Sequence, residues 1–150
     1  ADKKTCQCTS FKVDDGVLRV RRTGVGPGAG RIVVRMPSLA EATATEGACV
    51  TVRNVAGERC LVVSRGGGTV DISGRVDAAQ YRASGGGRAM GQSLRTGRTS
   101  VRLDGDGEVH CRADQELVVM ISGKGVVWSH GQPGLVTRKI SGGGELKFEK

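Results

Sequence analysis

The sequence is poor in aromatic residues, proline and long apolar runs, and each shortage excludes a class of protein. One Trp, one Tyr and two Phe in 150 residues cannot dominate a core, so aliphatic side chains, chiefly valine, must fill it. Three prolines beside 25 glycines exclude a collagen triple helix, which needs abundant proline at a strict period. No apolar run approaches the length of about 18 residues that a membrane-spanning helix requires. The opening residues, ADKKTCQCTS, do not have the pattern of a signal peptide.

Histidine is also scarce, and its placement does not predict a metal site. His110 and His130 are the only two, and neither has a cysteine or carboxylate neighbour at the spacing of metal ligands. Asp71 and His110 are not expected to form a catalytic pair. Asp71 falls two repeats before His110, so the two would lie about 10 Å apart if repeats stack at strand spacing, which is too far for a hydrogen bond. We therefore expect no catalytic residues, no metal and no cofactor.

Five cysteines is an odd number, so at least one does not pair within the chain. Cys6 and Cys8 stand too close for an unstrained bridge to each other, and a bridge from either to Cys49 stays open. Cys60 and Cys111 lie in alternating apolar runs, where cysteine usually acts as a small buried hydrophobic residue.

The charge is strongly positive, with 23 Lys and Arg against 15 Asp and Glu, or +8 overall. Such an excess favours anionic partners, although a well-solvated basic surface would have the same composition. Among partners we expect an acidic glycan, a surface or matrix component, or a second copy of the chain, rather than nucleic acid.

Glycine clusters recur at a nearly constant interval. The last small residue of each cluster serves as an anchor, and successive anchors are 20, 19, 20, 18 and 19 residues apart. Self-similarity at such a period is typical of a solenoid, in which each repeat buries its apolar face only against its neighbours. The anchors are Ala48, Gly68, Gly87, Gly107, Gly125 and Gly144.

Alternating residues flank each anchor, as expected for strands that enter and leave a tight corner. The second and fourth residues after each anchor are mostly apolar, and a matching alternation precedes it; Ser64 and Arg138 are the exceptions. The helical alternatives, SLAEATATE and RADQELVVM, do not keep a 3.6-residue period for three turns. The sequence therefore predicts an all-β chain, a parallel β-solenoid with coils of about 19–20 residues forming a single domain over residues 1–150.

The order of these segments resembles a bacterial family. VDDGVLRVRR, GRIVVRMPSLAEATATEGACVTV and the closing ISGKGVVWSHGQPGLVTRKISGGGELKF are similar to the head GIN domain, also labelled putative auto-transporter adhesin. The resemblance implies a right-handed parallel β-helix in the cell envelope (periplasm or outer surface) or secreted, with no established catalytic activity. Family domains begin with a further β-rich segment, so the first coil, around residues 1–37, is expected to be incomplete or irregular.

A glycine-rich stretch, TGVGPGAG, matches a dinucleotide-binding fingerprint through Gly24, Gly26 and Ala29. Such a site needs a helix next, because the pyrophosphate binds at its N-terminus. RIVVRMP has the composition of a strand, so we interpret the stretch as a loop without a nucleotide.

Two outward columns supply the candidate binding residues. Arg82 and Arg102 fall on consecutive coils, with Arg88 near in sequence, and could bind carboxylates or sulfates; Asp104 and Asp106 could instead relieve their repulsion. His110 and Trp128 fall side by side in the other column, where an indole could stack on a sugar or pack against a neighbouring loop.

These columns point to a non-catalytic interaction or adhesion module with a stacked binding face. The alternatives are a carbohydrate-active enzyme of pectin-lyase-like architecture and a self-assembling structural solenoid.

Overall fold

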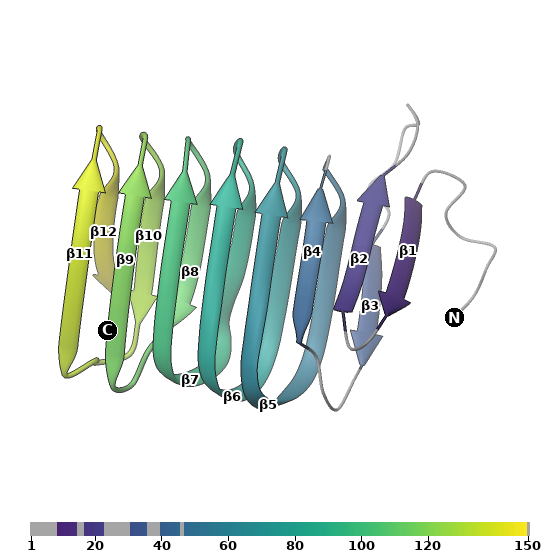
Figure 1. Ribbon diagram of the computed structural model, residues 1–150, viewed down its shortest axis with the longest axis horizontal. Coiled ribbons are helices and arrows are strands. Elements are labelled where there is room, and N and C mark those ends of the chain that lie inside the picture. The colour runs from purple at the N-terminus through teal and green to yellow at the C-terminus, as the bar shows by residue number, and fades with distance from the viewer. Residues whose placement is uncertain (1–8, 15–16, 23–30, 36–39, 46, 150) are drawn as a thin grey trace.

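In the computed structural model, equivalent segments of successive repeats lie side by side and wind one sheet into about six turns (Figure 1). The structure describes residues 9–14, 17–22, 31–35, 40–45 and 47–149, with side chains from residue 40 onward. The all-β solenoid is confirmed. Its strands are β1 Thr9–Asp14, β2 Val17–Arg22, β3 Arg31–Arg35, β4 Glu41–Thr45, β5 Cys49–Arg65, β6 Thr69–Ser84, β7 Arg88–Asp104, β8 Glu108–Arg112, β9 Glu116–Ser122, β10 Val126–His130, β11 Leu135–Ser141 and β12 Glu145–Glu149.

The pairing register follows the repeat. From β5 onward the strands pair in parallel, and the residue two after each anchor pairs with its equivalent in the next coil. In Figure 1 the near strands run upward and the far strands downward while the chain advances from right to left, so the solenoid is right-handed. The described residues of both segments that competed as helices are strand or loop, with β4 in the first and β9 in the second.

The core consists of inward columns that run along the solenoid axis. Val50, Val70, Ala89, Val109 and Val127 stack in one column, and each is fully buried. Complete burial of a valine side chain contributes about 1.5–3 kcal/mol relative to an exposed one. Stacked aliphatic side chains therefore fill the core of this chain, which has too few aromatic residues to do so.

Polar and glycine residues in the inward columns have specific reasons to be there. Ser64 is fully buried, and its hydroxyl donates to the carbonyl oxygen of Gly68 at 2.5 Å. A Cβ built at Gly91 would overlap the hydroxyl of Tyr81, the chain's only tyrosine, which is fully buried. The absence of a side chain at Gly91 therefore leaves room for the hydroxyl and ring edge of Tyr81.

The glycine corners allow both a left-handed backbone and close stacking. Gly66 and Gly67 have φ of 56° and 79°, a region that L side chains rarely adopt. At the anchor Gly87, an added Cβ would lie 2.5 Å from the carbonyl oxygen of Ser64 in the preceding coil. A side chain at Gly87 would therefore push the two coils apart.

The N-terminal strands depart from the regular pattern. β1 pairs antiparallel with β2, β2 pairs in parallel with β4, and β3 pairs in parallel with β5. β3 shows that RIVVR forms a strand, as predicted. The TGVGPGAG stretch, and with it the proposed loop, lies outside the described residues, as do Cys6 and Cys8.

The C-terminal coil presents its inner side chains to solvent. Val136 and Ile140 continue inward columns yet are 39% and 37% exposed, and Phe148 is 52% exposed. Arg138, an exception to the apolar pattern, continues the column that holds Val119 and is exposed like its neighbours in this coil.

Candidate functional site

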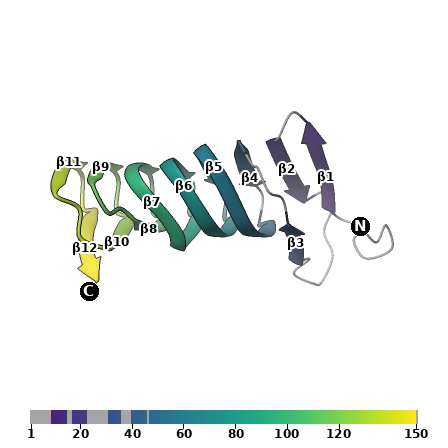
Figure 2. The ribbon, with the colours of Figure 1, turned by 90° about the horizontal axis from the view of Figure 1, so that it is seen from below.

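Each complete coil has two broad faces and a curved lower side (Figures 1 and 2). The first face contains β4, β9, β11 and the second halves of β5, β6 and β7. The second face contains β8, β10, β12 and the first halves of the same long strands. The long strands bend between the two halves, so three surfaces can carry binding residues.

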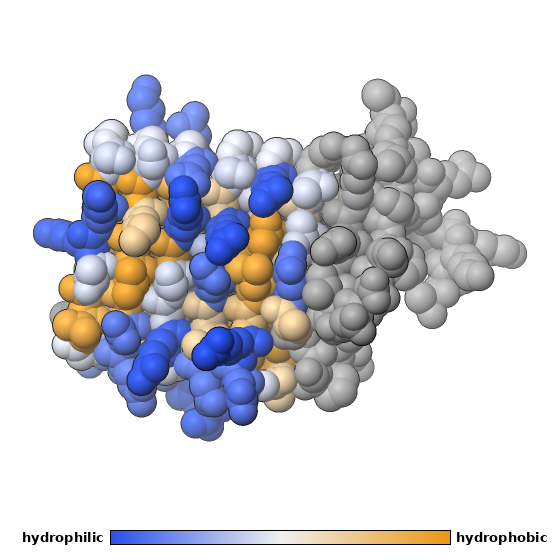
Figure 3. Space-filling view, in the orientation of Figure 1, coloured by the Kyte–Doolittle hydropathy of each residue, from blue (hydrophilic) through white to orange (hydrophobic). Residues whose placement is uncertain are grey.

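The first face holds a small basic pocket of about 230 Å³, lined by Arg65, Arg82, Ala83, Ser84, Arg102 and Asp104. The arginine column is confirmed, because Arg82 pairs in register with Arg102 one coil away. Arg102 Nε lies 3.2 Å from Asp104 Oδ2, whereas Arg82 has no carboxylate partner among the described residues. Three guanidinium groups against one carboxylate leave two positive charges in this lining. Figure 3 shows the hydrophilic side chains that cross this face.

Arg88 does not join the basic pocket. It follows the corner and pairs with Glu108, on the second face, rather than with a residue of the first face. Of the two carboxylates expected to relieve the arginines, Asp104 does so for Arg102, and Asp106 does not line the pocket.

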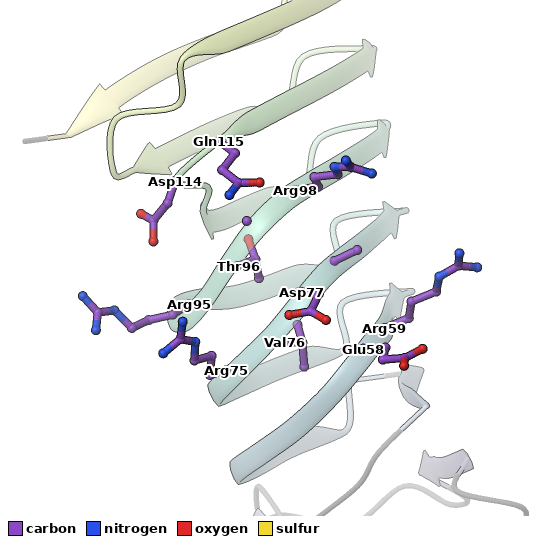
Figure 4. Close-up of a pocket in the computed structure, with 12 residues that line it drawn as sticks. Glu58, Arg59, Arg75, Val76, Asp77, Arg95, Thr96, Arg98, Asp114 and Gln115 are labelled. Carbon is purple, nitrogen blue, oxygen red and sulfur yellow. The ribbon is translucent and has the colours of Figure 1, made fainter.

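The curved lower side carries a corner groove of about 640 Å³ that crosses four coils. Figure 4 shows Arg75 and Arg95 extending on one side, Arg59 and Arg98 on the other, and Asp77 between them. The arginine charges are largely balanced, because the carboxylates of Glu58, Asp77 and Asp114 share the lining. A second cavity of about 520 Å³ adjoins it, with Cys60, Ala79 and Val118 among its lining residues.

Sequence reasoning missed the corner groove. Its residues lie more than six positions from any anchor, beyond the register shifts between Val52 and Val55 in one coil and between Asp71 and Ser73 in the next. The alternation that identifies inward and outward positions is interrupted there.

The second face brings His110 and Trp128 together as predicted. They pair in register, and their ring centroids are 6.0 Å apart with the planes inclined by 13°. Lys147 Nζ lies 5.1 Å from the centroid of the Trp128 ring on the other side, a cation–π distance. The histidine is half-buried rather than solvent-exposed, with only 17% of its side chain accessible.

A run of four polar side chains, here called the histidine chain, crosses the same face. His110 Nε2 lies 2.8 Å from Glu108 Oε1, and His110 Nδ1 lies 3.2 Å from His130 Nε2. His130 Nδ1 in turn lies 3.4 Å from Glu149 Oε2. A sequence signal existed: Arg112, His130 and Glu149 are each the fifth residue after an anchor and so form one outward column.

The environment of His130 lowers its pKa. Burial is the largest cause, the neighbouring His110 and Arg112 act in the same direction, and the carboxylate of Glu149 opposes them. Burial also raises the pKa of the Cys60 thiol to about 11 and that of Cys111 to about 12, which fits their predicted role as core residues.

The four predicted site residues do not form one site. Arg82 and Arg102 lie on the first face, and His110 and Trp128 lie on the second, with the core between them. Within the described ranges, no group of three or more His, Cys, Asp or Glu side chains is arranged to hold a metal ion. No helix long and apolar enough to cross a membrane occurs in those ranges.

A family model described as "Putative auto-transporter adhesin, head GIN domain" matches residues 1–133. The chain belongs to this family. Among curated proteins, none matches the chain. Of the solved structures, a putative adhesin from Bacteroides fragilis matches with a TM-score of 0.72 at 17% identity, over 95% of this chain and 77% of that one. This likeness shows the shared fold alone, and the description of the family supports an adhesion-type module. The family also suggests a cell-surface or envelope location.

Proposed function

We propose that this head GIN domain binds an acidic glycan of the cell surface or matrix through the basic pocket on its first face. The observation that carries the proposal is the stacking of Arg82 on Arg102 without a carboxylate for Arg82 among the described residues. Adhesion needs an outward surface that meets an extended partner, and parallel coils supply a flat one. The adhesin family and the adhesin-like fold support this class of function.

The charge arrangement favours an anion from the partner. Two guanidinium groups carried by neighbouring strands, whose backbones are about 4.8 Å apart, repel each other, and a carboxylate or sulfate between them would turn this repulsion into two charge-assisted contacts. Asp104 engages Arg102 from one side only, and both side chains of that pair are at least 49% exposed. Such an exposed pair is weak, so an anionic ligand can compete with it.

The corner groove is less suited to a polyanion. Its four arginines face three carboxylates, so the lining carries one net positive charge where the smaller basic pocket carries two. It is nevertheless a useful control, because Arg75 and Arg95 also pair in register on neighbouring coils.

The test compares Arg82→Ala/Arg102→Ala with the matched control Arg75→Ala/Arg95→Ala. Both variants lose two positive charges from stacked arginines, so they differ only in location. Binding to immobilised polygalacturonate and dextran sulfate, with neutral dextran as the blank, would be measured by surface plasmon resonance. Loss of charge-assisted hydrogen bonds worth about 1.5 kcal/mol or more should weaken the first variant at least tenfold. The control should change less than threefold.

Two outcomes would contradict the proposal. An equal loss in both variants would mean that net charge alone governs binding, and a loss only in the control would move the site to the corner groove. The alternative of a carbohydrate-active enzyme has its own assay: release of reducing ends from the same polysaccharides should stay at the level of the blank.

A further inference from the structure

A mostly apolar trough crosses the first face next to the basic pocket. It is the cavity of about 520 Å³ described above, and it runs along the solenoid axis across β5, β6, β7 and β9. Its floor consists of outward side chains that are mostly apolar or short: Leu61, Ala78, Gln80, Ser100 and Val118. We call this cavity the first-face trough.

Arginines border the first-face trough on both sides. On the lower side Arg59 and Arg98 lie two coils apart, and Ala78 stands between them in register. On the upper side Arg82 and Arg102 pair in register on β6 and β7. Figure 3 shows a band of apolar surface on this face, with strongly hydrophilic side chains above and below it. The trough therefore combines an apolar floor with two cationic edges.

These arginines are not neutralised by the carboxylates beside them. Within the described ranges, Arg59, like Arg82, forms no ion pair, and Arg98 Nε lies 3.9 Å from Glu116 Oε2 with side-chain exposures of 73% and 39%. Such an exposed and distant pair contributes little. The linings of the trough and the basic pocket together contain five arginines and two carboxylates, so they carry three net positive charges.

We propose that the first-face trough and the basic pocket form one extended site for a 1,4-linked uronate chain that lies along the solenoid axis. This inference rests on the proposed function and names the shape of its glycan. Successive sugars of a ribbon-like chain point their carboxylates to opposite edges, where the two arginine rows can bind them. The C–H face of each ring packs on the floor, and Gln80 and Ser100 can hydrogen-bond to its hydroxyl groups.

The length of the trough sets the length of chain that it can hold. Four neighbouring strands span about 14 Å from the first to the last, about the length of three sugar rings. A disaccharide seated between Arg82 and Arg102 would not also reach the lower edge. A tetrasaccharide would contact both edges, so chain length distinguishes this site from the basic pocket alone.

An acyl chain is the competing occupant of a trough with an apolar floor. The outward side chains of the floor are exposed or half-buried, so the trough is open to water. An acyl chain lying in it would keep one side in water and lose part of the benefit of burial. A sugar ring instead turns its hydroxyl groups to that side. The open trough and its cationic edges therefore favour the uronate chain.

The test measures the affinity for oligogalacturonates of defined length by isothermal titration at an ionic strength of about 0.15 M, where long-range charge effects are largely screened. We expect the tetramer to bind at least tenfold more tightly than the dimer, because only the tetramer gains charge-assisted contacts with the lower arginines. Longer oligomers should gain little more.

Variants separate the two edges. Arg59→Ala/Arg98→Ala should weaken tetramer binding at least tenfold and leave dimer binding within threefold of the parent, whereas Arg75→Ala/Arg95→Ala should change neither by more than threefold. Arg59 and Arg98 also line the corner groove, but Ser100 lines the trough alone. Ser100→Leu, which obstructs the floor without changing charge, should therefore also weaken the tetramer, and Ser100→Ala should not. Thermal melts verify that each variant is folded.

The outcomes distinguish this inference from the proposed function. Equal affinity for dimer and tetramer, or no greater loss in Arg59→Ala/Arg98→Ala than in the corner-groove control, would overturn the extended site and leave the basic pocket standing. If Arg82→Ala/Arg102→Ala bound both oligomers like the parent, the basic pocket would fall, and a tetramer loss in Ser100→Leu would still support the trough. Saturable binding of phosphatidylglycerol vesicles without binding of the tetramer would assign the trough to an acyl chain and overturn the proposal.

Discussion

Replacing Gly91 with alanine tests the stacked core most sharply. Gly91 lies in an inward column, and a Cβ there would overlap the Tyr81 hydroxyl and come within 2.7 Å of the ring carbon that bears it. Tyr81 is fully buried, and its hydroxyl has no hydrogen-bond partner among the described residues. The ring therefore cannot move aside without displacing side chains of the neighbouring coils.

The expected cost follows from two opposing effects. Overpacking of a rigid core costs about 1–3 kcal/mol. Glycine-to-alanine replacement recovers roughly 0.4–1 kcal/mol by restricting the unfolded chain, since Gly91 has no positive φ that alanine could not adopt. The net loss of unfolding free energy should be about 1–2 kcal/mol. Tyr81→Phe should be neutral or stabilising, because it removes a buried hydroxyl that lacks a partner.

Urea denaturation of the two single variants and the double variant forms the assay. In the Tyr81→Phe background, Gly91→Ala should cost about 1 kcal/mol less than in the parent, because the hydroxyl overlap is gone. Ring carbons still lie within 2.8 Å, so relief is partial. Gly134→Ala is the control, since its Cβ would meet nothing closer than 3.8 Å. Identical costs in both backgrounds would refute the role of the tyrosine.

Two further predictions concern the thiols and the end coil. Burial raises the pKa of Cys60 from 9.0 to about 11 and that of Cys111 from 9.0 to about 12. The contribution of the neutral thiols to the stability of the folded protein is therefore fully present below pH 9 and is lost as the pH rises toward these values. Unfolding free energy should fall by up to about 1.4 kcal/mol per pH unit for each thiol, less in Cys111→Ala, and a flat profile in urea melts would contradict this. We also propose that two copies associate through exposed Val136, Ile140 and Phe148. Sedimentation should then show dimers that Phe148→Glu dissociates, whereas a wild-type monomer at all concentrations would refute it.

The repeat could be predicted because its signal is local and redundant. Glycine anchors and alternating valines recur in coil after coil, so Val50, Val70 and Val109 could be placed in one column from spacing alone. The same counting placed Arg82 beside Arg102 and His110 beside Trp128.

The rest depends on side-chain packing between coils. Gly91 interrupts the apolar column for a reason found only in the ring of Tyr81, ten residues earlier. His130 reaches His110 diagonally, so a column-by-column count does not pair them. Register shifts after Val52 and Asp71 change the count between each anchor and the corner groove, so a fixed period does not place the groove residues.

Every complete coil contributes to the first face, the second face and the shared hydrocarbon core at once. Inserting or deleting one unit of about 19–20 residues would therefore lengthen or shorten both outer surfaces together by about 4.8 Å, while leaving the corner geometry intact. The length of an extended polymer that such a module can contact therefore depends on the number of stacked units. This length can change without altering any contact inside a unit.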